Sequence, residues 1–181
     1  MPRKTRQLEF SGSQFKRPKD WFGGSHLTSH PKRARPLDRK LPIHVVLRSK
    51  KSVLRAPANF AFVNRIVTTA AKKYGIRLYE FANVGNHIHL LIKISTPGLW
   101  RRFIREITGR IAQFALKLGA RDRSDGFWLH RPFTRIVRSL RRAYRVVQDY
   151  ILLNRLESEG FIDRGVIRSV AQLKALTEGS A

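Results

Sequence analysis

The sequence contains no cysteine and no long apolar run, and it has few acidic residues. Without cysteine there can be no disulfides, thiolate zinc sites or cysteine nucleophiles, so any bound metal must use His, Asn, Gln, Asp or Glu. A chain without thiols also suits a reducing compartment, and we expect a cytoplasmic protein. No stretch approaches the roughly 20 apolar residues of a membrane span, and the N-terminus lacks the apolar core of a signal peptide. We therefore expect no membrane partner.

The scarcity of acidic residues leaves a large positive charge. The chain has only 12 Asp and Glu but 37 Lys and Arg, which gives a formal net charge of +25. Such a chain needs a polyanionic partner, and nucleic acid is the obvious one, which also predicts association with the nucleoid. A ribosomal protein or a membrane-surface protein could carry the same charge, so composition alone leaves these classes open.

The chain divides into a polar arm, one domain and a short tail. Its 181 residues can bury one ordinary core and leave no room for a second large domain. Residues 1–40 are rich in Arg, Lys, Pro, Gly and Ser, which predicts a basic, flexible N-terminal arm that is either solvated or in contact with DNA. Residues 163–181 are expected to form a tail with a short helix over residues 166–176.

Between arm and tail, the apolar periodicities predict seven elements in the order βαββαβα. We expect them at residues 43–48, 59–75, 77–82, 86–94, 96–118, 127–138 and 139–159. Asn59 is expected to cap the first helix, Gly75 to end it and Thr96 to cap the second. The segment 83–85 has the composition of a hairpin turn.

This order predicts an α+β fold of the ferredoxin-like or RRM-like type. In that arrangement βαββαβ forms a four-stranded antiparallel sheet with two helices on one face. The last helix can then cover part of the other face. Because the fold hosts many functions, it assigns none by itself.

The segment at 85–92 carries the strongest chemical signal. Strand alternation places His87 and His89 on one face, while Ile88 and Leu90 enter the core. Neutral imidazole is a good ligand for divalent metals, and two imidazoles at alternate strand positions make a rigid half-site that needs further ligands. The same pattern also occurs in strands that bind nothing.

A second signal lies in the last predicted helix. Tyr150 and Asn154 are four residues apart, so a phenol and an amide oxygen lie on one helical face. Tyr144 with Gln148 repeats this spacing and remains an alternative, as does a purely structural Tyr150 in the core. His44 is expected on the same sheet face as the histidine pair, in a supporting or packing role.

Several separated motifs resemble the HUH single-tyrosine transposases, especially the REP-associated tyrosine transposases. The segment 43–48 is similar to the family's first strand, and 82–90 is similar to its histidine-hydrophobe-histidine strand. Trp128 with 131–135 follows the pattern. The segment 149–154 resembles the nucleophile helix, in which a polar ligand follows the tyrosine by four residues. The resemblance covers residues 41–162 and departs from many relatives at Arg155, where they have proline.

The resemblance implies a function and a set of roles. Tyr150 would be the nucleophile, and His87, His89 and Asn154 would bind Mg²⁺ or Mn²⁺. The protein would be a DNA transposase, an endonuclease and strand transferase that cuts and rejoins single-stranded or hairpin DNA through a 5′-phosphotyrosine, as a homodimer or a monomer. The candidate DNA-contacting residues are Arg48, Arg101, Arg102, Arg105, Arg131, Arg135 and Arg138.

Two other functions remain open at this point. A noncatalytic nucleic-acid-binding protein of RRM-like fold would carry stacking aromatics on its middle strands, where this chain has histidines. Trp100 and Trp128 could stack on bases or pack in the core. A replication or conjugation nickase of the HUH class would share the chemistry but usually has a longer chain.

Overall fold

The computed structural model describes residues 21–24, 35–117, 126–138, 141–163 and 165–178, with only the backbone described for Trp21, Lys117 and residues 141–144 and 177–178. Most of the predicted N-terminal arm therefore lies outside the described residues. So does most of the segment 119–126, which connects the predicted elements at 96–118 and 127–138. Nine elements are described. They are β1 (Trp21–Phe22), β2 (Ile43–Arg48), α1 (Pro57–Lys73), β3 (Arg77–Asn83), β4 (His87–Lys93), α2 (Pro97–Lys117), β5 (Phe133–Ile136), α3 (Arg141–Ser158) and α4 (Val170–Glu178).

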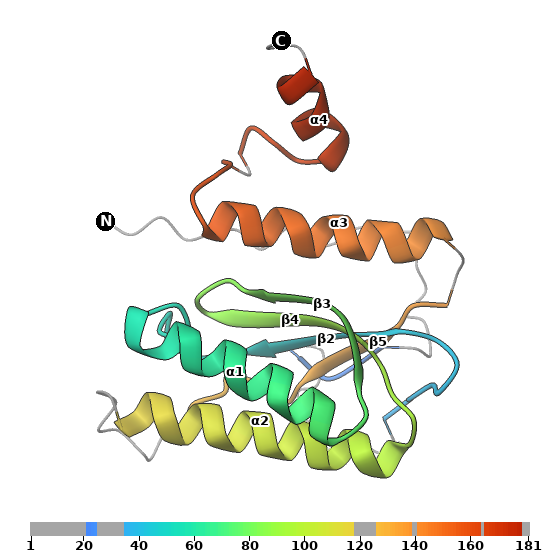
Figure 1. Cartoon of the computed structure of the whole chain (residues 1–181), viewed down its shortest axis with the longest axis vertical. Helices are drawn as coiled ribbons and strands as arrows, with labels where there is room; N and C mark the ends of the chain where they lie inside the picture. The colour runs from blue at the N-terminus through green and yellow to red at the C-terminus, as the bar shows by residue number, and fades with distance from the viewer. Residues whose placement is uncertain (1–20, 25–34, 118–125, 139–140, 164, 179–181) are drawn as a thin grey trace.

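The strands form one antiparallel sheet in the order β1-β5-β2-β4-β3. Helices α1 and α2 lie side by side on one face, and α3 packs on the other, over β3 and β4 (Figure 1). The four long strands and these helices confirm the predicted α+β fold. Strand β1 adds a fifth, two-residue edge strand that the sequence patterns did not predict.

Two apolar clusters lie on opposite faces of the sheet. The larger cluster joins the sheet to α1 and α2, and Ile88, Leu90 and Ile92 of β4 are fully buried in it. The smaller cluster joins Ala82 and Leu91 of the sheet to residues of α3. Because successive strand residues alternate between these clusters, the face of each β4 side chain is fixed.

The start of α1 differs from the prediction. Asn59 does not cap the helix, which begins at Pro57 with Ala56 as the capping residue. Proline suits the first turn, since its fixed φ is helical and the missing N–H would have no partner there. Asn59 is instead buried and donates from Nδ2 to the Val53 carbonyl at 2.8 Å, which ties the helix to the preceding loop.

The other helix ends follow the sequence signals more closely. Gly75 ends α1 with φ of 60°, and Thr96 Oγ1 accepts from the Leu99 N–H at 3.3 Å, as the predicted caps require. The tail helix starts at Val170, later than predicted. There Ser169 Oγ accepts from the Gln172 N–H, and Gln172 Oε1 accepts from the Ser169 N–H, a reciprocal cap that fixes the start.

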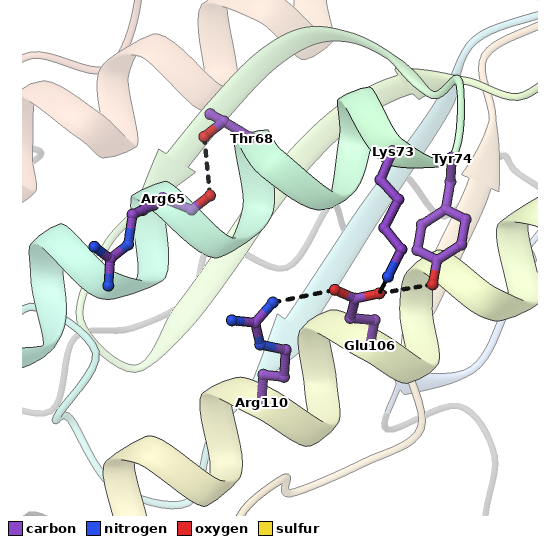
Figure 2. A network of polar contacts seen from close by, with 6 residues as sticks. All are labelled: Arg65, Thr68, Lys73, Tyr74, Glu106 and Arg110. Atoms are coloured by element: carbon purple, nitrogen blue, oxygen red, sulfur yellow. Dashed lines mark hydrogen bonds and ion pairs between the residues drawn. The ribbon is translucent and has the colours of Figure 1, made fainter.

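A polar cluster joins the outer surfaces of α1 and α2 (Figure 2). Glu106 of α2 accepts hydrogen bonds from Lys73 Nζ at 2.7 Å, from the Tyr74 hydroxyl at 2.6 Å and from Arg110 Nη1 at 3.1 Å. The hydrogen bonds from Lys73 and then Tyr74 lower the pKa of Glu106 to about 2. One carboxylate thus links both helices.

We predict that Glu106→Gln lowers the free energy of unfolding by about 1 kcal/mol, since exposed ion pairs each contribute less than that. The folded-state pKa lies below the ordinary 4.5, so this stabilisation exists above pH 4.5 and is lost as the pH falls towards about 2. Urea unfolding at low and high salt measures it. The exposed Glu159, just beyond α3, provides the matched control, and an equal effect of Glu159→Gln would contradict the prediction.

Candidate functional site

Strand β4 presents two histidines towards α3. His89 is almost fully buried, with 1% of its surface exposed, on the face opposite Ile88 and Leu90. The ring centroids of His87 and His89 lie 4.6 Å apart, as the alternation predicts for side chains two residues apart. Gly85, with φ of 96°, makes the turn from β3 that starts β4 at His87.

His44 of β2 joins this pair. Val46 lies opposite His89 in the β2–β4 register, so His44 lies diagonally across from His89 on the same face. His44 Nε2 and His89 Nδ1 are 3.3 Å apart and buried. The two rings are nearly parallel, with centroids 5.6 Å apart. His44 therefore contacts a member of the histidine pair directly.

Helix α3 brings Tyr150 to the histidines. Val147 and Ile151 are buried against the sheet, so the helical face between them points inward. The half-buried Tyr150 ring meets His89 edge-on at a centroid distance of 5.4 Å and His44 at 6.3 Å. A tyrosine and three histidines thus meet between α3 and the sheet.

Asn154 lies one helical turn after Tyr150. Its Nδ2 donates to the Tyr150 carbonyl at 2.6 Å, which orients the amide group. A metal would use the amide oxygen, and this hydrogen bond leaves that atom unused. The described contact of Asn154 is with Tyr150, not with the histidines, so its role as a ligand stays a prediction.

The competing pair is only partly described. Gln148 forms a hydrogen bond with the sheet: its Nε2 donates to Glu80 Oε1 of β3 at 2.9 Å. This hydrogen bond holds the Gln148 amide at β3. The side chain of Tyr144 lies outside the described residues. The geometry therefore favours Tyr150, whose ring contacts His89 and His44.

The three histidines are held neutral. Burial, aided by Arg135, lowers the pKa of His44 to about 4, and burial, aided by Arg48, lowers the pKa of His87 to about 4. Burial and the neighbouring His87 lower the pKa of His89 well below its ordinary 6.5. Neutral imidazole is the form that binds metal ions.

Two imidazole nitrogens suit a metal ion. Nε2 of His87 and Nε2 of His89 are buried, and neither has a hydrogen-bond partner within the part of the chain that the structure describes. An unsatisfied buried polar atom costs about 1–3 kcal/mol, and a bound ion or water is one way to satisfy it. Arg55, Asn59 and Asn64 also have such atoms, but only the two histidine atoms lie on neighbouring rings. No three His, Cys, Asp or Glu side chains among the described residues could hold a metal ion by themselves. Among the described residues, a further protein ligand would therefore come from another kind of group, such as an amide oxygen.

The candidate DNA-contacting arginines fall on different faces. Arg48 and Arg135 lie beside the histidines, as their effects on the histidine pKa values show. Arg131 and Arg138 are exposed on either side of β5. The remaining group is exposed on α2, which covers the opposite face of the sheet (Figure 1). These residues are Arg101, Arg102 and Arg105. The sequence had not distinguished these groups.

The tryptophans weighed for base stacking are structural. Trp100 is 3% exposed and belongs to the larger cluster. Trp128 packs against that cluster and donates from Nε1 to the Thr108 carbonyl at 3.0 Å. One residue of the site was not predicted: Asn86, whose Oδ1 is hydrogen-bonded to His87 Nδ1. Its position directly before the histidine was the only signal.

The first residues of the predicted arm that are described pack on the sheet. Phe22 is buried, and the Arg35 guanidinium lies over its ring at 4.4 Å. Arg35 Nη1 also donates to the Pro132 carbonyl at 2.7 Å and to Thr134 Oγ1 at 2.8 Å. These residues therefore belong to the folded body beside β5.

We predict that metal-free protein loses stability in mild acid. Because the histidine pKa values are lower in the folded protein than in the unfolded chain, acid protonates the unfolded chain first. The free energy of unfolding is therefore at its full value above pH 6.5 and decreases as the pH falls towards about 4. Each such histidine contributes up to about 1.4 kcal/mol per pH unit. The urea midpoint should fall between pH 7 and 5, and less in His87→Gln. An unchanged midpoint in the wild type would contradict the prediction.

The comparisons point to one family. A family model described as IS200-like transposase matches residues 39–152. A solved structure described as a REP-associated tyrosine transposase bound to a REP hairpin aligns with a TM-score of 0.52 and 12% identity, over 73% of this chain and 76% of that one. A protein from Deinococcus radiodurans R1, provisionally assigned as a transposase, aligns with a TM-score of 0.44 and 17% identity, over 68% and 98%. No curated protein matches the sequence. None of the described helices is long and apolar enough to cross a membrane.

Proposed function

The chain belongs to the family of IS200-like transposases, and we propose that it cuts and rejoins single-stranded or hairpin DNA through a covalent bond to Tyr150. The observation that carries this proposal is the contact of the Tyr150 ring with His89, beside two buried imidazole nitrogens that have no hydrogen-bond partner among the described residues. The net charge of +25 suits a DNA substrate. We place the catalytic domain at residues 41–162.

In the proposed reaction the Tyr150 oxygen attacks the scissile phosphorus and gives up its proton. The bond from phosphorus to the 3′ oxygen breaks, and that oxygen leaves as a 3′-hydroxyl after taking a proton. The 5′ end stays on Tyr150 as a phosphotyrosine. Since this ester keeps the energy of the broken phosphodiester, another 3′-hydroxyl can attack it and rejoin DNA without ATP.

The donor set fits a divalent cation. His87 and His89 would bind Mg²⁺ or Mn²⁺ through Nε2, and Asn154 would bind it through the amide oxygen. Such an ion would stabilise the charge that develops on the phosphate oxygens. Arg48 and Arg135, next to the histidines, would attract the phosphate.

The architecture argues against a noncatalytic RRM-like reader. Such proteins stack bases on aromatics of an open sheet face. Here α3 packs over β3 and β4 on that face, and Tyr79 of β3 packs in the smaller cluster beneath it. The face opposite is covered by α1 and α2.

We predict that Tyr150→Phe abolishes the covalent adduct and leaves DNA binding within about two-fold, because only the nucleophilic oxygen is lost. Tyr144→Phe is the matched control and should form adduct. The assay incubates protein with Mn²⁺ and single-stranded oligonucleotides from DNA flanking the gene, followed by denaturing electrophoresis. If the adduct survives in Tyr150→Phe and disappears in Tyr144→Phe, the nucleophile is Tyr144 and not Tyr150. No adduct in the wild type would favour a binding protein.

We also predict that binding to single-stranded DNA weakens steeply with salt, because phosphate contacts release counterions. Replacing Arg101, Arg102 and Arg105 together by Gln should reduce the slope of log affinity against log salt by about 2 if all three contact phosphate. Fluorescence anisotropy between 50 and 200 mM salt, a range of about four-fold, measures this. An unchanged slope would remove these residues from the DNA-binding surface.

A further inference from the structure

Both histidines of β4 have their Nδ1 atoms engaged. His87 Nδ1 is hydrogen-bonded to Oδ1 of Asn86, and His89 Nδ1 lies 3.3 Å from His44 Nε2. The Nε2 atoms of His87 and His89 are the buried ones that lack partners within the described chain. The two rings therefore present the same nitrogen.

The partner of each Nδ1 atom bears on where the ring proton lies. A carbonyl oxygen such as Asn86 Oδ1 can only accept, so His87 must donate from Nδ1 and keep an electron pair on Nε2. Between His89 Nδ1 and His44 Nε2, one nitrogen must donate a proton and the other must accept it. If His89 donates from Nδ1, then His44 Nε2 accepts, the proton of His44 is on its own Nδ1, and His89 Nε2 keeps its electron pair.

We propose that Asn86 and His44 are positioning residues that hold His87 and His89 in the Nδ1-protonated form, with both Nε2 electron pairs directed at a divalent cation. This inference rests on the proposed function and deepens it. It assigns a purpose to a buried histidine and to an asparagine in a turn.

Both positioning residues are themselves held in place. The Asn86 carbonyl accepts from the Ser49 N–H at 2.8 Å, which fixes the turn to the end of β2. His44 is 8% exposed, and the rings of Phe133 and Tyr150 meet it edge-on, each at 6.3 Å. Ligands oriented in this way lose less freedom when a metal binds.

The first test needs no metal. Long-range ¹H–¹⁵N correlation spectra of the metal-free protein at pH 7.5, assigned with single histidine variants, report which ring nitrogen carries the proton. We expect the Nδ1-protonated form for both His87 and His89. The Nε2-protonated form at either residue would overturn the inference for that residue, whatever the protein does with DNA.

The second test measures Mn²⁺ affinity from the electron paramagnetic resonance of the free ion. His44→Leu and Asn86→Leu, which lose the acceptor, should weaken binding by about 10- to 100-fold, the usual effect of losing such a partner. His44→Gln and Asn86→Asp, which keep an acceptor oxygen, should bind several-fold more tightly than the leucine variants. Equal affinities across wild type and leucine variants would overturn the inference.

The two proposals fail in different ways. Wild-type protein that binds no Mn²⁺ would overturn the metal site of the proposed function. The spectra of the metal-free protein would then be the remaining test of whether Asn86 and His44 fix the protons of His87 and His89. Wild-type binding with unchanged affinity in the leucine variants would leave the metal site intact and remove the positioning role.

Discussion

Strand β4 pairs with β2 on one side and β3 on the other, and the site depends on the register of these pairings. Ile88, Leu90 and Ile92 are completely buried beneath α1 and α2, so they fix which side chains face α3. A shift of one residue would place His89 in the apolar core and an isoleucine beneath Tyr150. The hydrophobic core therefore sets the geometry of the histidines, although it contains none of them.

This arrangement has an energetic cost at the site. Three neutral imidazoles lie together, with His44 and His89 buried and His87 half-buried. Two of their nitrogens lack partners within the described residues, and arginines lie beside them. The costs of about 1–3 kcal/mol for each unsatisfied atom must be offset by the large core. The same features suit a phosphate and a cation: neutral ligands, open electron pairs and nearby positive charge. An unfavourable local structure is expected where a substrate completes it.

Local patterns predicted the fold and the main side chains of the site. The alternation of β4 placed His87 and His89 on one face, and the spacing of α3 placed Tyr150 beside Asn154. The contact of His44 with His89 could not be predicted, because it depends on the register between strands 45 residues apart. The prediction that Asn59 caps α1 was wrong, because the helix begins earlier, at Pro57. Strand β1 was missed because two residues carry no periodicity.

The central claim is that His87, His89 and Asn154 together bind a divalent cation next to Tyr150. Anomalous diffraction from crystals soaked in Mn²⁺ tests it most directly, because the signal locates the metal without any assumption about activity. The account predicts one peak roughly 2 Å from both Nε2 atoms and from the Asn154 amide oxygen. A peak bound instead by Gln148, or no peak between His87 and His89 at saturating Mn²⁺, would contradict it.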